Sequence, residues 1–215
     1  MAILDEETKN QLKQMFSGLS GKVKLIFFKP SAGCQFCAQV EELVNEVVST
    51  SSILTSQIHV LEEEKELAKR YKLDKAPAII IEGKNKGLVR YFGIPSGYEF
   101  SSFIQDIIDA STGEVELPDD IKQKIKSINF PLHIQVFVTP TCPYCPPMVK
   151  LAHDLALLNE NVVADMVEAT EFRELAMKYN VQGVPKTIVN EKQEFDGAYP
   201  ADIFIKRILE LKGKD

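Results

Sequence analysis

The sequence contains no apolar run of about 18 residues, the length that a membrane-spanning helix requires, so we expect no segment that crosses a bilayer. It has no glycine-rich phosphate-binding loop, and we therefore expect no bound nucleotide and no other cofactor. It also has no excess of positively charged residues. Its net charge of −6 disfavours nucleic acid and anionic membranes as partners. Residues 1–10 are acidic and show no apolar signal segment, so a cytoplasmic location is expected.

Cysteine and histidine are both scarce. The four cysteines form two closely spaced pairs, which leaves none for a structural disulfide framework. In an intracellular chain such pairs are more often catalytic or metal-binding than structural. The three histidines do not fall at ligand spacing with the cysteines, and we expect them to be surface or strand residues: His59, His133 and His153.

The second cysteine pair lies between a strand pattern and a helix pattern. Cys142-Pro-Tyr-Cys145 follows alternating apolar residues over 132–138 and precedes apolar residues at helical spacing over 148–158. The pair is therefore expected at the N-terminus of a helix, where the dipole and free N–H groups stabilise a thiolate. A thiolate with a second thiol two residues away can carry out thiol–disulfide exchange.

The chain contains this arrangement twice. Cys34-Gln-Phe-Cys37 follows an apolar stretch at 23–28 and precedes a second helical pattern. Each first cysteine is followed 43 residues later by a proline, Pro77 or Pro185. Residues 65–73 and 173–181 also agree at a constant offset of 108. The sequence is a tandem duplication, and we predict two domains, residues 1–115 and 116–215.

Each half is predicted to be α/β, with the order helix, strand, helix, strand, helix, strand, strand, helix. The linker is expected at 111–118, and the acidic run 62–64 is expected to open a helix. The other expected helices lie at 5–19, from the first cysteine pair to about 49, 100–108, 119–129, after the second pair, 171–179 and 201–211. The expected strands lie at 23–28, 57–61, 78–81, 89–92, 132–138, 162–167, 187–190 and near 195.

This order, with a cysteine pair after the central strand and a proline before the hairpin, resembles the thioredoxin fold, a central mixed sheet flanked by helices. Cys142-Pro-Tyr-Cys145 is the motif of glutaredoxins. Two such units in one chain resemble the glutaredoxin-like protein disulfide oxidoreductases of thermophilic archaea and bacteria. The resemblance implies dithiol–disulfide exchange with protein disulfides, electron supply from a thioredoxin-reductase-like flavoenzyme, and a cytosol where protein disulfides are common. It also implies two sheets joined edge to edge.

The resemblance assigns roles to individual residues. Cys34 and Cys142 match exposed attacking thiols, and Cys37 and Cys145 match the less exposed resolving thiols. Pro77 and Pro185 match a cis-proline that lies against the cysteine pair. A bend there leaves the backbone of the preceding residues, Ala76 and Val184, free to pair with an extended substrate chain. Phe36 and Tyr144 are expected to border the substrate groove.

Two features depart from the pattern of the resembled proteins. The buried aspartate that often relays protons in thioredoxins is replaced by Phe28 and Val136. We consider three carboxylates as substitutes: Glu62, Asp165 and Glu168. The second departure is the pair Pro146-Pro147, which predicts a late or strained helix start after Cys145.

The two cysteine pairs should differ in redox potential, because Pro143 stiffens one intervening dipeptide and Gln35 leaves the other flexible. We predict that the pair at Cys142 is the dominant catalytic site and that the pair at Cys34 assists it. Three alternatives to this oxidoreductase remain: a structural zinc site, a thioredoxin-fold binding module without catalysis, and a glutathione-dependent glutaredoxin. Working redox direction, client proteins and oligomeric state do not follow from the sequence.

Overall fold

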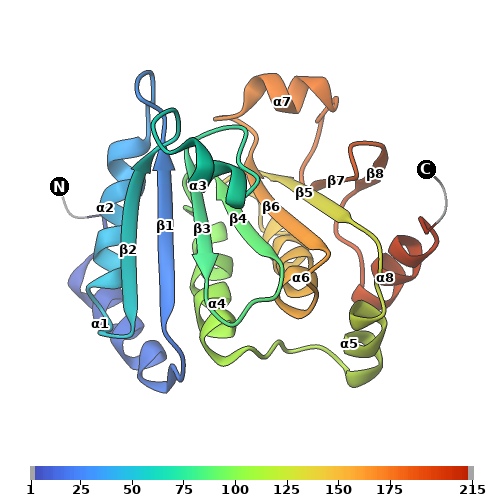
Figure 1. Ribbon diagram of the computed structural model, residues 1–215, viewed down its shortest axis with the longest axis horizontal. Coiled ribbons are helices and arrows are strands. Elements are labelled where there is room, and N and C mark those ends of the chain that lie inside the picture. The colour runs from blue at the N-terminus through green and yellow to red at the C-terminus, as the bar shows by residue number, and fades with distance from the viewer. Residues whose placement is uncertain (1–2, 213–215) are drawn as a thin grey trace.

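The computed structural model describes residues 3–212, and its eight described strands form one sheet in the order β2-β1-β3-β4-β6-β5-β7-β8 (Figure 1). The predicted element order is confirmed in both halves. The elements of the first half are α1 (Glu6–Met15), the short 3-10 helix η1 (Phe16–Gly18), β1 (Val23–Lys29), α2 (Cys37–Val48), β2 (Leu54–Val60), α3 (Lys65–Arg70), β3 (Ala78–Glu82), β4 (Leu88–Phe92) and α4 (Glu99–Thr112). Those of the second half are α5 (Asp119–Lys126), β5 (Leu132–Val138), α6 (Cys145–Leu158), β6 (Val162–Glu168), α7 (Arg173–Lys178), β7 (Lys186–Val189), β8 (Gln193–Asp196) and α8 (Ala201–Leu209).

Parallel pairing of β4 with β6 joins the two half-sheets, with Leu88 opposite Val163 and Phe92 opposite Val167. Within each half the central strand pairs parallel with one neighbour and antiparallel with the other, which makes both half-sheets mixed. The edge-to-edge arrangement implied by the resemblance is confirmed.

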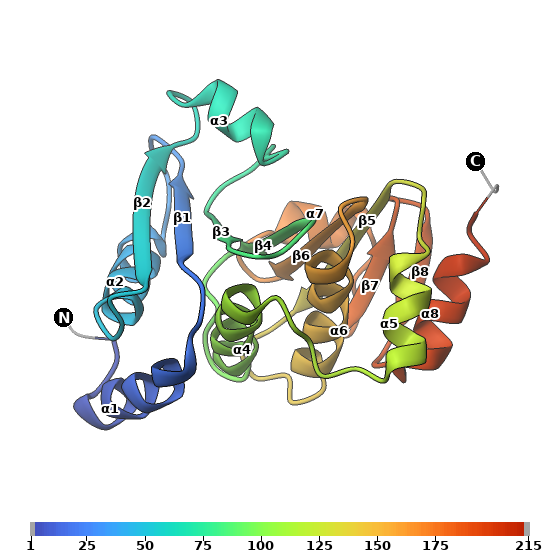
Figure 2. The same ribbon diagram turned by 60° about the horizontal axis from the view of Figure 1, so that its bottom comes forward.

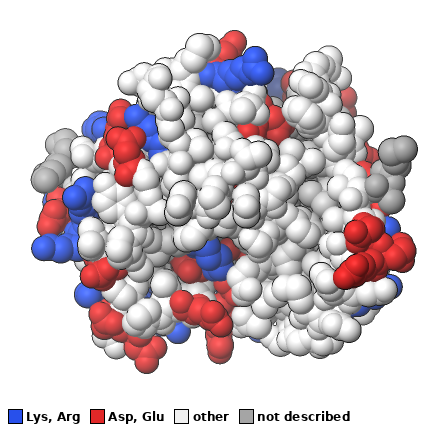
Figure 3. Space-filling view, turned by 180° about the vertical axis from the view of Figure 1, so that it is seen from behind, with Lys and Arg blue, Asp and Glu red and all other residues white. Residues whose placement is uncertain are grey.

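The helices divide unequally between the two faces of the sheet. The larger apolar core lies on the face covered by α1, α2, α4, α5, α6 and α8. Figure 2 shows α4 and α6 side by side on this face, so that helices of both halves pack against each other. Seen from this side, charged side chains gather toward the outline and the broad centre is mostly uncharged (Figure 3). The shorter helices α3 and α7 cover a smaller core on the other face.

Several boundary predictions were wrong. Strand β2 begins at Leu54 rather than at residue 57, and α5 ends at Lys126 rather than at residue 129. Residues 61–63 form a turn, and α3 begins only at Lys65, because the N–H groups of Glu63 and Glu64 both donate to the carbonyl of Val60. The predicted linker begins too early. Ser111 is a buried residue of α4, and its hydroxyl donates 2.7 Å to the carbonyl oxygen of Gly21.

A buried ionic network lies at the junction of the half-sheets. Arg90 on β4 stands directly opposite Asp165 on β6, and the guanidinium reaches both carboxylate oxygens at 2.7 and 2.8 Å. His133 on β5 lies 2.7 Å from Asp165 through Nε2 and 2.9 Å from Glu191 through Nδ1. Although burial opposes ionisation, Arg90 and His133 hold the pKa of Asp165 well below its ordinary value. The network links three strands by charge.

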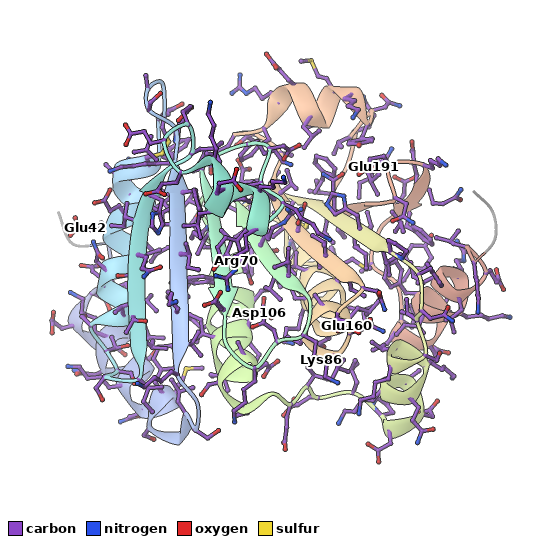
Figure 4. All side chains as sticks on the ribbon, viewed as in Figure 1. Glu42, Arg70, Lys86, Asp106, Glu160 and Glu191 are labelled. Atoms are coloured by element: carbon purple, nitrogen blue, oxygen red, sulfur yellow. A yellow bond between two sulfur atoms is a disulfide. The ribbon has the colours of Figure 1, made fainter. Side chains whose placement is uncertain are left out.

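A second polar cluster lies between α4 and α6. Asp106 accepts from the Tyr91 hydroxyl and contacts Nδ1 of His153, each at 2.5 Å (Figure 4). Lys150 bridges Asp109 at 2.6 Å and Asp154. His153 is fully buried in a helix, so the expectation of a surface or strand residue was wrong for it. Polar groups as well as apolar contacts therefore hold the two halves together.

Of the helices within residues 3–212, none combines the length and the apolar character needed to cross a bilayer.

Asp165→Asn is expected to lower the free energy of unfolding by about 3 kcal/mol or more, because it leaves the buried Arg90 without its counter-charge. Denaturant titration measures the change. The matched control is Asp120→Asn at the exposed Lys124–Asp120 pair, where a change below about 0.5 kcal/mol is expected. Equal effects of the two variants would contradict a dominant role of this network.

Candidate active site

The two cysteine pairs occupy equivalent places, where β1 and β5 lead into the helices that follow them. Cys37 and Cys145 are the first residues of α2 and α6. Both pairs are disulfide-bonded, with 5.5 Å between the Cα atoms of each pair. The structure therefore brings each predicted pair of catalytic cysteines into bonding contact at a helix N-terminus.

The first cysteine of each pair is the more exposed one. Cys34 is partly exposed and Cys37 is 8% exposed. Cys142 is only 7% exposed and Cys145 is fully buried. The expected order within each pair is confirmed, but the description of Cys142 as an exposed thiol was wrong for this disulfide form. Attack at Cys142 requires a partner that reaches into the surface.

The expectation of a late helix start after Cys145 was also wrong, since α6 begins at Cys145 itself. The first-turn N–H groups of a helix have no acceptor within the helix, so proline costs no hydrogen bond there. The two helices nevertheless present different donors. In α2, Ala38 and Gln39 carry first-turn N–H groups, whereas Pro146 and Pro147 in α6 have none. The N-terminus of α6 has fewer donors for an anion.

The two predicted cis-prolines are confirmed, since Ala76–Pro77 and Val184–Pro185 are cis peptides. Sγ of Cys142 lies 3.6 Å from the carbonyl oxygen of Val184, which places this bend against the second cysteine pair. Ala76 lies with Cys34 in the lining of one groove. The strand ladders begin only after each proline, at Ala78 and Lys186, so Ala76 and Val184 lie outside the sheet pairing.

The aromatic residues of the two motifs are placed differently. Phe36 is partly exposed and lines the groove at Cys34. Tyr144 is 70% exposed beside Cys142. Tyr98, at the start of α4, is 54% exposed and its N–H donates to the carbonyl of Pro140, in the loop before Cys142. The second site is therefore bordered by a residue from the first half of the chain.

None of the three carboxylates considered as a proton relay is placed as a free buried acid. Asp165 is paired with Arg90 at the junction of the half-sheets, which holds its pKa low, so it is not free to act as a relay. Glu168 accepts from Thr170 and from the N–H of Glu171, and it holds the turn after β6. Glu62 is exposed and accepts from the N–H of Ser31.

Glu99 is a buried acid that the sequence reasoning missed. It is 1% exposed, and neither carboxylate oxygen has a hydrogen-bond partner within the described residues. Burial raises its pKa to about 8. Ser102, one turn further along α4, lies 3.5 Å through Oγ from the carbonyl of Pro146 in the first turn of α6. A buried acid therefore lies one helical turn before the residue of α4 that contacts the first turn of α6, and only the packing of α4 on α6 reveals it.

Metal coordination is not indicated: within residues 3–212 no cluster of three or more His, Cys, Asp or Glu side chains could hold a metal ion.

Fold and site together define a thioredoxin-like disulfide oxidoreductase with two disulfide-capable cysteine pairs. The profile of the Thioredoxin domain family matches residues 22–105 and again residues 132–210, and the chain belongs to this family.

Curated relatives match nearly the whole chain. The chain is 28% identical over 196 residues to the AhpF component of alkyl hydroperoxide reductase from Staphylococcus epidermidis, and the match covers 90% of this chain and 35% of the relative. The chain thus spans about a third of the length of the curated relatives it matches.

Solved structures agree over nearly the whole chain. A protein disulfide oxidoreductase from Aeropyrum pernix has a TM-score of 0.87 at 27% identity, and the match covers 96% of this chain and 94% of that one. The AhpF component of alkylhydroperoxide reductase from Enterococcus faecalis (C503A mutant) has a TM-score of 0.87 at 23% identity, covering 95% and 98% of the two chains. The second likeness shows the shared fold.

The double variant Pro146→Ala/Pro147→Ala is expected to speed alkylation of the reduced Cys142 at neutral pH about two- to fivefold, because it adds two N–H groups at the helix N-terminus. Mass spectrometry of iodoacetamide-treated protein measures the rate at each cysteine. The duplication supplies the reciprocal change, Ala38→Pro/Gln39→Pro, which should slow alkylation of Cys34 by a similar factor. If neither rate moves, the first-turn donors do not control these thiols.

Proposed function

We propose that the chain exchanges disulfides with other proteins through both cysteine pairs, with Cys34 and Cys142 as attacking thiols and Cys37 and Cys145 as resolving thiols. The observation that carries this proposal is the contact between Sγ of Cys142 and the carbonyl of Val184, just before a cis-proline. In the reduced form the thiol would have a proton to donate at this point, next to backbone that the sheet leaves unpaired.

In the reducing direction, the first thiolate attacks one sulfur of the substrate disulfide, and the other substrate sulfur leaves as a thiolate. The second cysteine, once deprotonated, attacks the mixed disulfide and releases the remaining substrate thiolate. The enzyme pair becomes a disulfide, two electrons pass to the substrate, and the two protons of the enzyme dithiol end on the two substrate thiols. Oxidation of a dithiol substrate is the reverse sequence.

The substrate is held as an extended segment at the bend before each proline. Ala76 and Val184 supply backbone groups for strand-like pairing, and Pro77 and Pro185 shape the bend. Phe36 and Tyr144 contact the side chains that flank the reacting cysteine. The accessible edges at both bends support this assignment.

Residues 1–115 and 116–215 form one catalytic unit each, with cysteine pairs that work in the cytoplasm. The two separate matches of the family profile support this division. A thioredoxin-reductase-like flavoenzyme would return electrons to the oxidised pairs. The similarity to a component of an alkyl hydroperoxide reductase, of which this chain spans about a third, is consistent with a separate donor protein.

Glu99 serves as the proton acceptor and donor for the pair at Cys145. The resolving thiol must lose a proton before it attacks, and a carboxyl whose pKa is raised to about 8 by burial can exchange a proton near neutral pH. The position of Glu99 on α4, one turn before Ser102, whose Oγ lies 3.5 Å from the carbonyl of Pro146 in the first turn of α6, supports this role.

The predicted ranking of Cys142 over Cys34 remains a prediction, and two structural features weigh against it. Cys142 is the more buried attacking residue, and its helix has fewer first-turn N–H donors. In its favour, the buried acid Glu99 lies on α4, the helix whose Ser102 contacts the first turn of α6.

The central test is insulin reduction with dithiothreitol by the variants Cys34→Ser, Cys142→Ser and the combination of both. Each single variant should keep the activity of the other site, and the double variant should fall to the rate of dithiothreitol alone. Equal losses in the single variants would refute the ranking of the sites. Activity of the double variant above that background would refute both thiols as nucleophiles.

The same proteins decide between electron donors, because the Cys-Pro-Tyr-Cys motif also fits a glutaredoxin. Turnover with NADPH and a thioredoxin-reductase-type flavoenzyme supports the proposed function. Turnover with glutathione and glutathione reductase alone would favour the glutaredoxin alternative.

Glu99→Gln is expected to change two pH dependences. Between the ordinary pKa of 4.5 and about 8 the folded protein keeps a proton that the unfolded chain has lost, so the free energy of unfolding falls as pH rises through this window. The variant should flatten that fall, as measured by denaturant titration at several pH values. The reduction rate at the Cys142 pair, plotted against pH, should also lose its inflection near pH 8 in this variant. Glu160→Gln, at an exposed glutamate, is the control, and an unchanged slope would contradict the buried acid.

A further inference from the structure

The groove at Cys34 is built by both halves of the chain. It has a volume of about 780 Å³, and the first half contributes the cysteine loop, Lys75, Ala76 and Pro77. The opposite wall comes from the second half, residues Thr170–Leu175 and Lys178, at the start of α7 and along it. By contrast, the pocket beside Pro185 is lined by Asn180, residues 182–186 and residues 196–197, which all belong to the second half.

Sheet topology explains why the two sites differ. The first groove lies beyond β4, and β4 pairs with β6, whose end leads into α7. The equivalent strand in the second half is β8, and within the described chain no strand pairs with its outer side. The segment at α7 therefore forms a wall at the Cys34 site, and among the described residues no equivalent wall forms at the Cys142 site.

A pair of equivalent glycines makes this difference visible. Gly93 and Gly197 follow β4 and β8, have φ of +94° and +85°, and donate to the carbonyls of Pro77 and Pro185, respectively. A Cβ on Gly93 would lie 2.7 Å from both Glu168 Cβ and Glu171 Oε1, atoms of the second half. A Cβ on Gly197 would meet no described atom within 4 Å.

The wall is fixed in place by contacts across the junction. The N–H of Ile94 donates to Glu171 Oε1 at 2.7 Å, and Phe172 packs edge-on against Phe92 with 5.9 Å between ring centroids. Glu168 in turn accepts from the N–H of Glu171 at 2.6 Å. The groove is thus preformed, so that binding need not order its wall.

Charged side chains line this groove. Arg173 and Lys178 are exposed. Arg173 donates through Nε to the carbonyl of Thr170, and Lys178 stacks on Tyr179, so neither is paired with a carboxylate within the described residues.

The other charged residues of the lining differ from these two. Lys75 is bound to Asp74, and Glu174 is the exposed carboxylate of the lining. Glu171 is turned to Ile94, and burial raises its pKa. In a chain of net charge −6, the wall contributed by α7 presents two unpaired cations to the groove.

We propose that α7 of the second half selects substrates for the cysteine pair of the first half, and that Arg173 and Lys178 favour extended segments with acidic residues next to the reacting cysteine. This inference rests on the proposed function of Cys34. The partner is an extended polypeptide because the groove runs along the unpaired backbone at Ala76, between Phe36 and α7. The site at Cys142, without such a wall, does not share this preference.

The test uses enzymes with one working pair. The Cys34 enzyme carries Cys142→Ser/Cys145→Ser, and the Cys142 enzyme carries Cys34→Ser/Cys37→Ser. The probes are two disulfide-linked peptide dimers that differ only in having Asp or Asn on both sides of the cysteine, with dithiothreitol as reductant. The measured quantity is the ratio of kcat/KM for the Asp peptide to that for the Asn peptide.

The Cys34 enzyme should prefer the Asp peptide about fivefold, as expected for two modest surface charge interactions, and added salt should reduce this preference. Arg173→Ala/Lys178→Ala should bring the ratio close to one in the Cys34 enzyme and leave it unchanged in the Cys142 enzyme. The matched control is Lys65→Ala/Arg70→Ala, the equivalent positions on α3, which should not alter the ratio. Thermal unfolding of each variant checks that the fold is retained.

Three outcomes would overturn the inference. One is a Cys34 enzyme that does not distinguish the peptides, and another is a preference that survives Arg173→Ala/Lys178→Ala. The third is an equal loss of the preference for the Asp peptide in the Cys142 enzyme, which would mean that α7 acts on the site of its own half. Reduction of hydroxyethyl disulfide separates these results from failure of the proposed function. A Cys34 enzyme that cannot reduce even this small disulfide would overturn both the function of that pair and the inference.

Discussion

The parallel pairing of β4 with β6 is the contact on which the rest of the structure depends. Each half alone would expose an unpaired edge strand, and the pairing satisfies both edges in one continuous sheet. It also brings α4 beside α6 on one face and the start of α7 beside the first cysteine loop. The environment of each redox site therefore follows from how the halves are joined.

Charge fixes the register of this pairing. Arg90 and Asp165 stand opposite each other on the two strands, fully enclosed and bonded to one another. A shift by one residue would place the two side chains on opposite faces of the sheet and separate two buried charges. The cluster of Asp106, His153 and Lys150 acts in the same way between α4 and α6, since the contacts of Asp106 with His153 and with Lys150 form only when both helices are in place.

Duplication has produced two sites with the same parts and different surroundings. Both have a cysteine pair that opens a helix and a cis-proline that faces it. At Cys142 the residues from the other half are Tyr98, whose N–H donates to Pro140 before the cysteine, and Ser102, whose Oγ lies 3.5 Å from the carbonyl of Pro146 after it. At Cys34 the neighbour from the other half is the wall at α7. One chain in this way holds two cysteine pairs of different exposure and different neighbours without any change in the reacting groups.

The sequence by itself determined the duplication, the element order, both cysteine pairs and both cis-prolines, because these are local patterns or fixed spacings along the chain. It misplaced the start of α3 and the linker, where side-chain and backbone hydrogen bonds decide the boundary. Glu99, the buried His153 and the wall at Arg173 could not be found from the sequence. Their burial and their neighbours come from elements about 50 to 140 residues away, and only the tertiary packing of one half on the other brings those elements together.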